Sequence, residues 1–217
     1  MWDMTPIGDL DLTMKYQYFG RPKKLLLPDE VWQYGERVMP MSVPLNMIRP
    51  KVYLGDFSLV IKAGTPVNYK VQTPFYFCAP ERYHGFDPSY ATDMWSYMVI
   101  FGILYAGNTL FHGGEGDRAM SCMVQTLGPM PPHWNGRYDI SGGNSCSSWY
   151  DPSVNPLPNT THETKIRRFR PNIEEEELSL ALRVLAKVFR YEPGERITAA
   201  QLLNDSEFNE LLGRYGC

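Results

Sequence analysis

Apolar side chains are densest in residues 90–106, where they occupy nearly every position from Met94 onward. A segment of this length with apolar residues on all sides predicts a helix that is buried all round. Ser89 or Thr92 can cap its first amides, and Asp93 lies in its first turn, where the helix dipole favours a carboxylate. We therefore expect the central helix of the fold at this position.

Three further segments have the apolar spacing of helices. Residues 117–127 predict a short amphipathic helix, and residues 173–191 predict a longer one whose apolar positions recur at three- and four-residue steps. Thr198 and Gln201 form a capping box that opens a last helix. The acidic run 174–177 falls in the first turns of the longer helix, which suits a solvated face. The chain is expected to be mainly α-helical.

The remaining segments are short strands or irregular. Residues 52–54 and 59–61 predict two short strands, while the prolines scattered through residues 1–50 exclude long helices there. Residues 129–172 are rich in Gly, Pro, Ser and Asn, which predicts a long irregular excursion on the surface. These patterns divide the chain into an irregular, insert-like segment at 1–50 and a helical domain at 51–217.

Composition and charge narrow the class of protein. The chain has 217 residues, enough for one domain with a single core, and its net charge of -3 argues against a general nucleic-acid binder. The four cysteines form no metal or redox spacing, which favours free thiols in a reducing compartment. With no signal-peptide pattern and no apolar run of membrane-spanning length, we expect an intracellular protein of the cytoplasm or nucleus.

Two charged residues lie in settings where burial would need a partner. Glu81 ends an irregular segment just before the apolar helix, and Arg196 lies in a Pro-Gly turn between two helices. A buried carboxylate is costly unless it is paired, and a planar guanidinium can pair with it through two hydrogen bonds. From these residues alone, two separate surface charges are the favoured interpretation and a buried pair is the alternative.

A third carboxylate has the setting of a metal ligand. Asp56 follows the strand predicted at 52–54, and Mg²⁺ prefers hard oxygen donors together with phosphate. The Asp-Phe dipeptide that Asp56 forms with Phe57 is common in proteins. This pattern is therefore weak by itself.

The order of these features resembles the C-terminal lobe of a eukaryotic protein kinase. Asp56 with Phe57 comes first, the run Phe75–Tyr83 with Ala-Pro-Glu follows, then the apolar helix that Asp93 opens, and finally Arg196. The resemblance implies an incomplete kinase fold of helices and a few short strands.

The same resemblance implies roles for individual residues. It makes 56–81 the activation segment, Glu81 and Arg196 a structural pair, and Asp93 the residue that holds the backbone of the catalytic loop. It implies ATP and magnesium as cofactors, with Asp56 as the residue that binds both. Ser58 replaces the glycine of the family motif, and this puts the metal geometry in doubt.

The segment before Glu81 is similar to the loop that receives a protein substrate. Thr73 and Tyr76 lie in it, and a threonine at position 73 fits serine/threonine kinases better than tyrosine kinases. Residues 18–24 and 127–134 look most like the SR-protein kinase group. The resemblance then implies a protein partner rich in Arg-Ser, with no nucleic-acid or membrane partner.

Several kinase motifs are absent before Asp56. No Gly-rich loop, strand lysine or His-x-Asp loop precedes it, and the first histidine of the chain is His84. We expect a serine/threonine kinase domain of the SR-protein kinase type, present as a C-lobe fragment that is inactive alone. The alternative is a pseudokinase-like module that binds Arg-Ser-rich segments or another kinase, and whether the chain is an enzyme stays open. An unrelated helical domain would leave Glu81 and Arg196 far apart.

Overall fold

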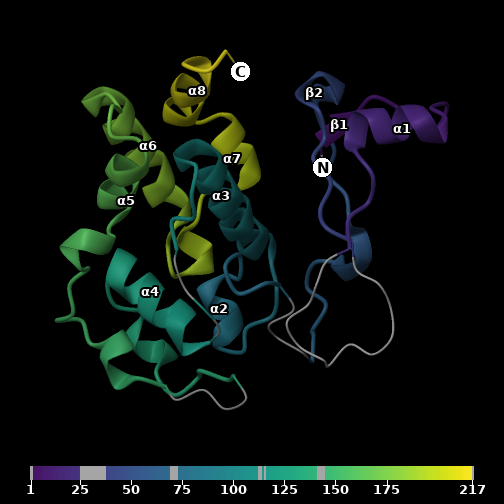
Figure 1. Cartoon of the computed structure of the whole chain (residues 1–217). Helices are drawn as coiled ribbons and strands as arrows, with labels where there is room; N and C mark the ends of the chain where they lie inside the picture. The colour runs from purple at the N-terminus through teal and green to yellow at the C-terminus, as the bar shows by residue number, and fades with distance from the viewer. Residues whose placement is uncertain are drawn as a thin grey trace. The chain divides into compact units, whose positions relative to one another are not determined.

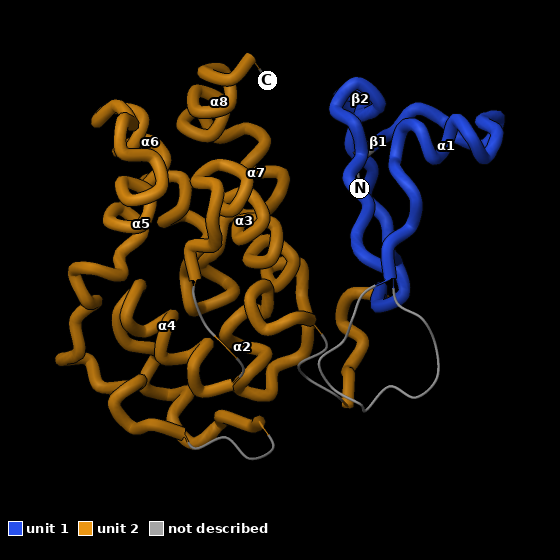
Figure 2. The backbone as a smooth tube through the Cα atoms, in the orientation of Figure 1, with its two compact units in different colours: residues 1–60 blue, residues 61–217 orange. Residues whose placement is uncertain are grey.

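The chain forms two compact units in the computed structural model, one of residues 1–60 and one of residues 61–217 (Figure 2). The structure describes residues 2–24, 38–68, 73–111, 114, 116–140 and 145–216. The predicted division into an insert at 1–50 and a helical domain at 51–217 remains a prediction, because compactness alone does not define a functional domain. Parts of the predicted activation segment, residues 69–72, lie outside the described residues.

The first unit has little core among its described residues. Its strands β1 (Trp2–Met4) and β2 (Ile48–Val52) pair antiparallel, with an irregularity between Trp2 and Met4. The helix α1 (Leu12–Phe19) begins at Asp11, whose Oδ1 accepts a hydrogen bond from the Met14 amide at 2.7 Å. Met47 is the one buried apolar residue described in this unit. A two-stranded ribbon of this kind is marginally stable by itself.

The two predicted strands are placed differently in the structure. Of the strand expected at 52–54, only Val52 is in a strand, the last residue of β2, and the strand expected at 59–61 is not formed. Residues Phe57–Leu59 form a single 3₁₀ turn, because the Val60 amide donates to the Phe57 carbonyl at 3.2 Å. That amide is thus used within the turn, and no neighbouring described strand pairs with this segment.

The second unit is built from helices, which confirms the predicted mainly α fold. Within it α6 contacts α3, α5 and α8 (Figure 1). The helices are α2 (Pro80–Tyr83), α3 (Tyr90–Ala106), α4 (Asp117–Leu127), α5 (His162–Phe169), α6 (Glu175–Val188), α7 (Ala199–Leu203) and α8 (Ser206–Gly213).

The central helix α3 has the bounds that the sequence predicts. The Ser89 amide donates to Thr92 Oγ1 at 3.1 Å, which satisfies one of the free amides at the helix start. At the other end Gly107 adopts φ 77°, and its amide donates to the Ile103 carbonyl at 2.8 Å. Trp95 is fully buried on the inner side of α3.

The prediction that α3 is buried all round was wrong. Tyr90, Tyr97, Ile100 and Leu104 are 77%, 46%, 48% and 71% exposed. Tyr97 lies seven residues after Tyr90, and Ile100 and Leu104 follow at steps of three and four residues, so the four side chains form one stripe along the helix. Apolar composition makes a helix suited to burial, but burial also needs a covering element, and the described residues provide none over this stripe.

The segment predicted as a surface excursion, 129–172, contributes to the core. It is mostly irregular, as expected, but it also contains α5, and Trp134, Trp149 and Tyr150 are no more than 4% exposed. Most described residues of this segment are exposed or half-buried, as predicted, but the prediction missed its buried aromatic side chains and α5. Three short 3₁₀ turns supply local hydrogen bonds to its backbone, and this lets the aromatic side chains turn inward.

The main core of the second unit lies between α3, α4, α5 and α6 and the C-terminal helices. Its fully buried large side chains are Trp95, Trp134, Tyr83, Met98, Leu110, Met120, Met123, Met130, Ile166, Leu178, Leu180 and Leu185. Among the described residues, no helix has the length and apolar character needed to cross a membrane.

Candidate functional site

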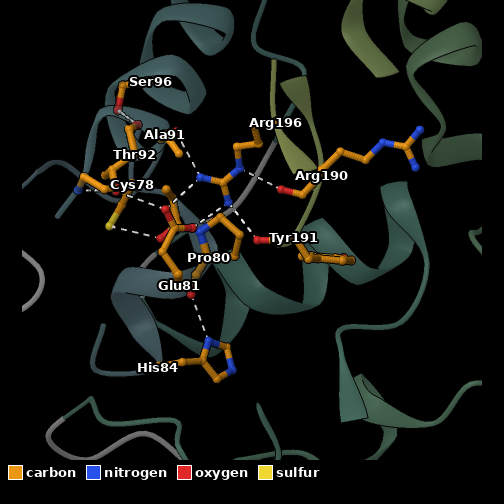
Figure 3. A network of polar contacts seen from close by, with 12 residues as sticks. Cys78, Pro80, Glu81, His84, Ala91, Thr92, Ser96, Arg190, Tyr191 and Arg196 are labelled. Carbon is orange, nitrogen blue, oxygen red and sulfur yellow. Dashed lines mark hydrogen bonds and ion pairs between the residues drawn. The ribbon is translucent and has the colours of Figure 1, made fainter. Parts of the chain in front are cut away.

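Glu81 and Arg196 meet in the buried interior of the second unit (Figure 3). The two guanidinium nitrogens of Arg196 donate to the two carboxylate oxygens of Glu81, at 2.7 Å for Nη1 to Oε1 and 2.6 Å for Nη2 to Oε2. Their side chains are 0% and 1% exposed. The structure thus brings together two predicted residues that are far apart in the sequence, in a buried two-point ion pair.

Every donor of the Arg196 guanidinium is used (Figure 3). Besides the two bonds to Glu81, Nε donates to the Arg190 carbonyl at 2.7 Å, Nη1 to the Ala91 carbonyl at 3.0 Å and Nη2 to the Tyr191 carbonyl at 2.9 Å. A guanidinium has five N–H groups, so none is left unsatisfied. A charge can be buried without a large penalty only under these conditions.

The carboxylate side of the pair is also tied to α3. Thr92 Oγ1 donates to Glu81 Oε1 at 3.0 Å, and the Trp95 ring lies 5.1 Å below the Arg196 guanidinium carbon. A cation over a tryptophan face is attracted by the ring quadrupole. The pair therefore links three segments that are separate in sequence: α2, the first turns of α3, and the turn after α6.

His84 forms a second link, which sequence reasoning missed. Its Nδ1 lies 2.8 Å from the Pro80 carbonyl and its Nε2 lies 2.8 Å from the Tyr150 hydroxyl. A carbonyl only accepts, so the network assigns the proton to Nδ1 and makes Nε2 the acceptor from Tyr150. Burial lowers the pKa of His84, which keeps the ring neutral. The sequence offered one hint of the contact with Pro80, since His84 lies four residues after it.

The buried thiol beside this network is not a nucleophile. Cys78 lies two residues before α2, and burial raises the pKa of its thiol to about 12. The reactive form of cysteine is the thiolate. Cys78 therefore stays a packed, neutral side chain at neutral pH.

The loop before α2 is fixed at both ends. The Tyr83 hydroxyl donates to the Phe75 carbonyl at 3.0 Å, and their rings stack with centroids 6.2 Å apart. Ser96 Oγ of α3 donates to the Phe77 carbonyl at 2.8 Å. Of the two predicted loop residues, Thr73 is half-buried. Tyr76, at the turn between Phe75 and Phe77, is 48% exposed.

Tyr76 and Phe77 border a cavity of about 840 Å³. Asp117, Arg118 and Gln125 of α4 also line it. Aromatic, charged and amide side chains therefore border the same space. Such a mixture suits a peptide segment, which carries both apolar and hydrogen-bonding groups.

Asp93 is placed in the first turn of α3, as predicted, with an exposed side chain. No described residue donates a hydrogen bond to its carboxylate, and partial burial by neighbouring side chains raises its pKa. Its role in holding a catalytic loop therefore remains a proposal.

Asp56 belongs to the first unit and is exposed. Its Oδ1 accepts a hydrogen bond from Ser58 Oγ at 2.9 Å, and its backbone has φ 62°, a left-handed conformation that costs energy for most residues. No group of three or more His, Cys, Asp or Glu side chains in the described part of the chain could hold a metal ion. Proteins often bind Mg²⁺ through one or two carboxylates plus nucleotide phosphates. Asp56 fits only as one ligand of such a shared site.

Known proteins similar to the chain are protein kinases, although no family model matches it. It is 26% identical over 161 residues to serine/threonine-protein kinase ppk5 of Schizosaccharomyces pombe, which covers 72% of this chain and 18% of that protein. It is 30% identical over 131 residues to serine/threonine-protein kinase AFC1 of Arabidopsis thaliana, with 60% and 26% covered. It is 31% identical over 136 residues to dual specificity protein kinase lkh1 of Schizosaccharomyces pombe, with 59% and 19% covered.

These similarities and the helix-rich structure support a kinase-like domain with the helical architecture of a kinase C-lobe. They do not single out the SR-protein kinase group. The matched region spans about a quarter or less of the length of these relatives. The activities of the whole relatives therefore reach this chain only as proposals.

Proposed function

We propose that the chain is the C-lobe-like part of a serine/threonine protein kinase of the SR-protein kinase type, and that its second unit holds the protein substrate. The observation that carries this proposal is the buried Glu81–Arg196 pair, together with the loop that ends at it. We further propose that residues 1–217 alone do not transfer phosphate.

The pair supports this role because it fixes the position of the substrate-facing loop. Phe75 and Phe77 are tied to α2 and α3, and α2 is tied through Glu81 to Arg196. A rigid support lets a loop hold a flexible peptide without the loop losing further conformational freedom. The exposed Tyr76 at the tip of this loop is the residue that would contact the substrate.

The surroundings of Asp56 support the proposed lack of phosphate transfer. Phosphoryl transfer depends on positioning and on charge stabilisation around the transferred group. Asp56 supplies one exposed carboxylate, and no Gly-rich loop, strand lysine or His-x-Asp sequence precedes it. When ATP and Mg²⁺ are present, Asp56 would supply one oxygen ligand to the metal.

A partner rich in Arg-Ser is favoured by two features. Residues 127–134 resemble a turn of the SR-protein kinase group, and the cavity beside Tyr76 is partly lined by Asp117. A carboxylate at this position can accept hydrogen bonds from an arginine side chain. We propose this segment class for the cavity.

Peptide binding tests the proposal directly. We expect a labelled Arg-Ser peptide to bind the purified chain, and Tyr76→Ala to weaken binding at least tenfold, equal to about 1.4 kcal/mol. Tyr90→Ala is the matched control, because Tyr90 is an exposed tyrosine outside the cavity. Equal affinity for the Arg-Ser peptide and for a Lys-Ala peptide of the same charge would contradict the proposed specificity.

A non-catalytic interaction module is the second candidate. It is favoured by the exposed, left-handed Asp56 and by Ser58 in place of glycine. Thermal unfolding separates the two candidates. A rise in melting temperature with magnesium-ATP that Asp56→Asn abolishes favours a surviving phosphate site, whereas a rise with the Arg-Ser peptide alone favours the module.

A further inference from the structure

A tyrosine from outside α4 contacts the carboxylate that lines the cavity beside Tyr76. The Tyr138 hydroxyl donates a hydrogen bond to Asp117 Oδ1 at 2.7 Å. Asp117 is the first residue of α4 and lines the cavity, whereas Tyr138 belongs to the segment 129–172 and does not border the cavity itself. Tyr138 can therefore influence a segment bound in the cavity only through Asp117.

The Tyr138 ring is held in place by a buried aromatic cluster. It packs edge-on against Trp149, with ring centroids 5.2 Å apart, and against His84, with ring centroids 5.9 Å apart. The next residue is fixed as well, because the Asp139 amide donates to the Tyr83 carbonyl at 2.9 Å. A tyrosine side chain has only two torsions, so the packing of its ring also sets the position of its hydroxyl.

Gly116 leaves room for this hydroxyl at the start of α4. Its backbone has φ 52°, in the left-handed region that favours glycine. A Cβ atom at this position would lie 3.2 Å from the Tyr138 hydroxyl oxygen, which is closer than ordinary van der Waals contact. The absence of a side chain at position 116 therefore lets Tyr138 approach Asp117.

The bond from Tyr138 leaves Asp117 able to bind a cation. Burial, together with this hydrogen bond, raises the pKa of Tyr138, so the hydroxyl keeps its proton and donates. A hydrogen bond to an ionised carboxylate is stronger than one between neutral groups. A carboxylate has about four acceptor positions and Tyr138 occupies one, so Asp117 can also accept hydrogen bonds from an arginine side chain.

We propose that Tyr138 is a positioning residue of this cavity, and that its hydroxyl holds Asp117 in the orientation that accepts an arginine of the bound segment. The inference rests on the proposed function, in which the cavity takes an Arg-Ser segment. Without the hydroxyl, the Asp117 side chain would have to be ordered during binding, and that ordering lowers affinity. A planar guanidinium depends on the orientation of its carboxylate partner more than a lysine ammonium does.

Two peptides of equal length and charge test this role. A labelled Arg-Ser peptide and a labelled Lys-Ser peptide are titrated into the full chain and into Tyr138→Phe. We expect the wild-type chain to prefer the Arg-Ser peptide. Tyr138→Phe should weaken that peptide about fivefold and the Lys-Ser peptide less than twofold, because the ammonium is a point charge. A merely structural hydroxyl would affect both peptides alike.

Two further variants show whether the effect passes through Asp117. In the Asp117→Asn background, Tyr138→Phe should cause no additional loss of Arg-Ser affinity, since residues that act as a unit are not additive. Tyr191→Phe is the matched control, because its hydroxyl donates to the Gly128 carbonyl at 2.7 Å and lies outside the cavity. It should leave both affinities unchanged. Thermal unfolding checks that every variant is folded.

The outcomes separate this inference from the proposed function. Equal weakening of the two peptides by Tyr138→Phe, no weakening of either, or a further loss in the Asp117→Asn background would overturn the positioning role alone. A wild-type chain that binds the Arg-Ser and Lys-Ser peptides equally would contradict the proposed Arg-Ser recognition, and the inference would fall with it.

Discussion

Glu81 and Asp56 are both carboxylates of motifs that resemble those of protein kinases, yet their surroundings differ completely. Glu81 is 1% exposed and accepts hydrogen bonds from Arg196 and Thr92. Asp56 is exposed and accepts one hydrogen bond from Ser58, two residues away. The residues that the resemblance makes structural are therefore part of the core, whereas the residue that it makes a metal ligand is a single solvated side chain.

Removal of Arg196 should have the largest effect on stability. Arg196→Leu leaves the Glu81 carboxylate buried without its cation, and breaking a buried pair from one side costs about 3–5 kcal/mol. Urea denaturation of the purified chain measures this loss. Asp56→Asn is the control and should change the free energy of unfolding by less than about 0.5 kcal/mol, since surface substitutions seldom do more.

The double variant sharpens this test. In Glu81→Leu with Arg196→Leu no isolated charge remains, so we expect part of the loss to be recovered relative to the sum of the single variants. Strict additivity of the two losses would show that the pair does not act as a unit.

Acid should weaken the packed region through its buried histidines. Burial and the nearby Lys165 ammonium lower the pKa of His162 to about 3, against 6.5 for the free side chain, and burial also lowers the pKa of His84. Below pH 6.5 the unfolded chain binds protons that the folded chain does not. The free energy of unfolding therefore decreases as the pH is lowered. For His162 this loss amounts to about 1.4 kcal/mol per pH unit between its folded and unfolded pKa values.

The measurement is the difference between wild type and His162→Gln in urea denaturation at several pH values. Because carboxylates titrate alike in both proteins, their contribution cancels. We expect the difference to shrink by about 2–3 kcal/mol between pH 6.5 and pH 4.5. A difference that does not vary with pH would show that His162 is protonated equally in the folded and unfolded states.

We expect a smaller change in stability from substitutions that alter the backbone preference at position 56. Asparagine tolerates the left-handed conformation, but alanine does not, so Asp56→Ala should be less stable than Asp56→Asn by about 1 kcal/mol. Thermal unfolding of the two variants checks the difference. Equal stability would mean that this turn is not held in its φ 62° conformation in solution.

The smallest effect is expected at an exposed pair with the same two-point geometry. Arg167 Nη1 and Nη2 donate to the two Glu175 carboxylate oxygens at 2.5 Å and 2.7 Å, but these side chains are 41% and 75% exposed. Water and salt screen such a pair. Arg167→Ala should therefore give a far smaller loss than Arg196→Leu, and that loss should vanish in high salt.

Local sequence patterns predicted helix positions well. The bounds of α3 and its cap by Ser89 and Thr92 follow from residues close together in the chain, and the structure confirms them. The Glu81–Arg196 contact could be predicted only through the family resemblance, because no local pattern connects residues so far apart. The turn at Phe57–Leu59 was mistaken for a strand, since strand formation depends on a pairing partner that sequence alone does not give.

Burial was the property that the sequence predicted least well. Trp134 and Trp149 lie in a segment whose composition indicates exposed loops, yet they pack into the core, while Leu104 lies in an apolar helix and is exposed. In each case exposure depends on which distant segment covers the side chain. Likewise the link between His84 and Tyr150 joins residues with no common motif.

Transfer of labelled phosphate from magnesium-ATP to an Arg-Ser peptide is the most direct measurement of the central claim, which is a kinase-like scaffold without phosphate transfer of its own. We predict that purified residues 1–217 incorporate no more label than the Asp56→Asn variant, while cooperative unfolding shows that both are folded and a known serine/threonine kinase labels the same peptide. Incorporation by the wild-type chain that Asp56→Asn abolishes would contradict the account.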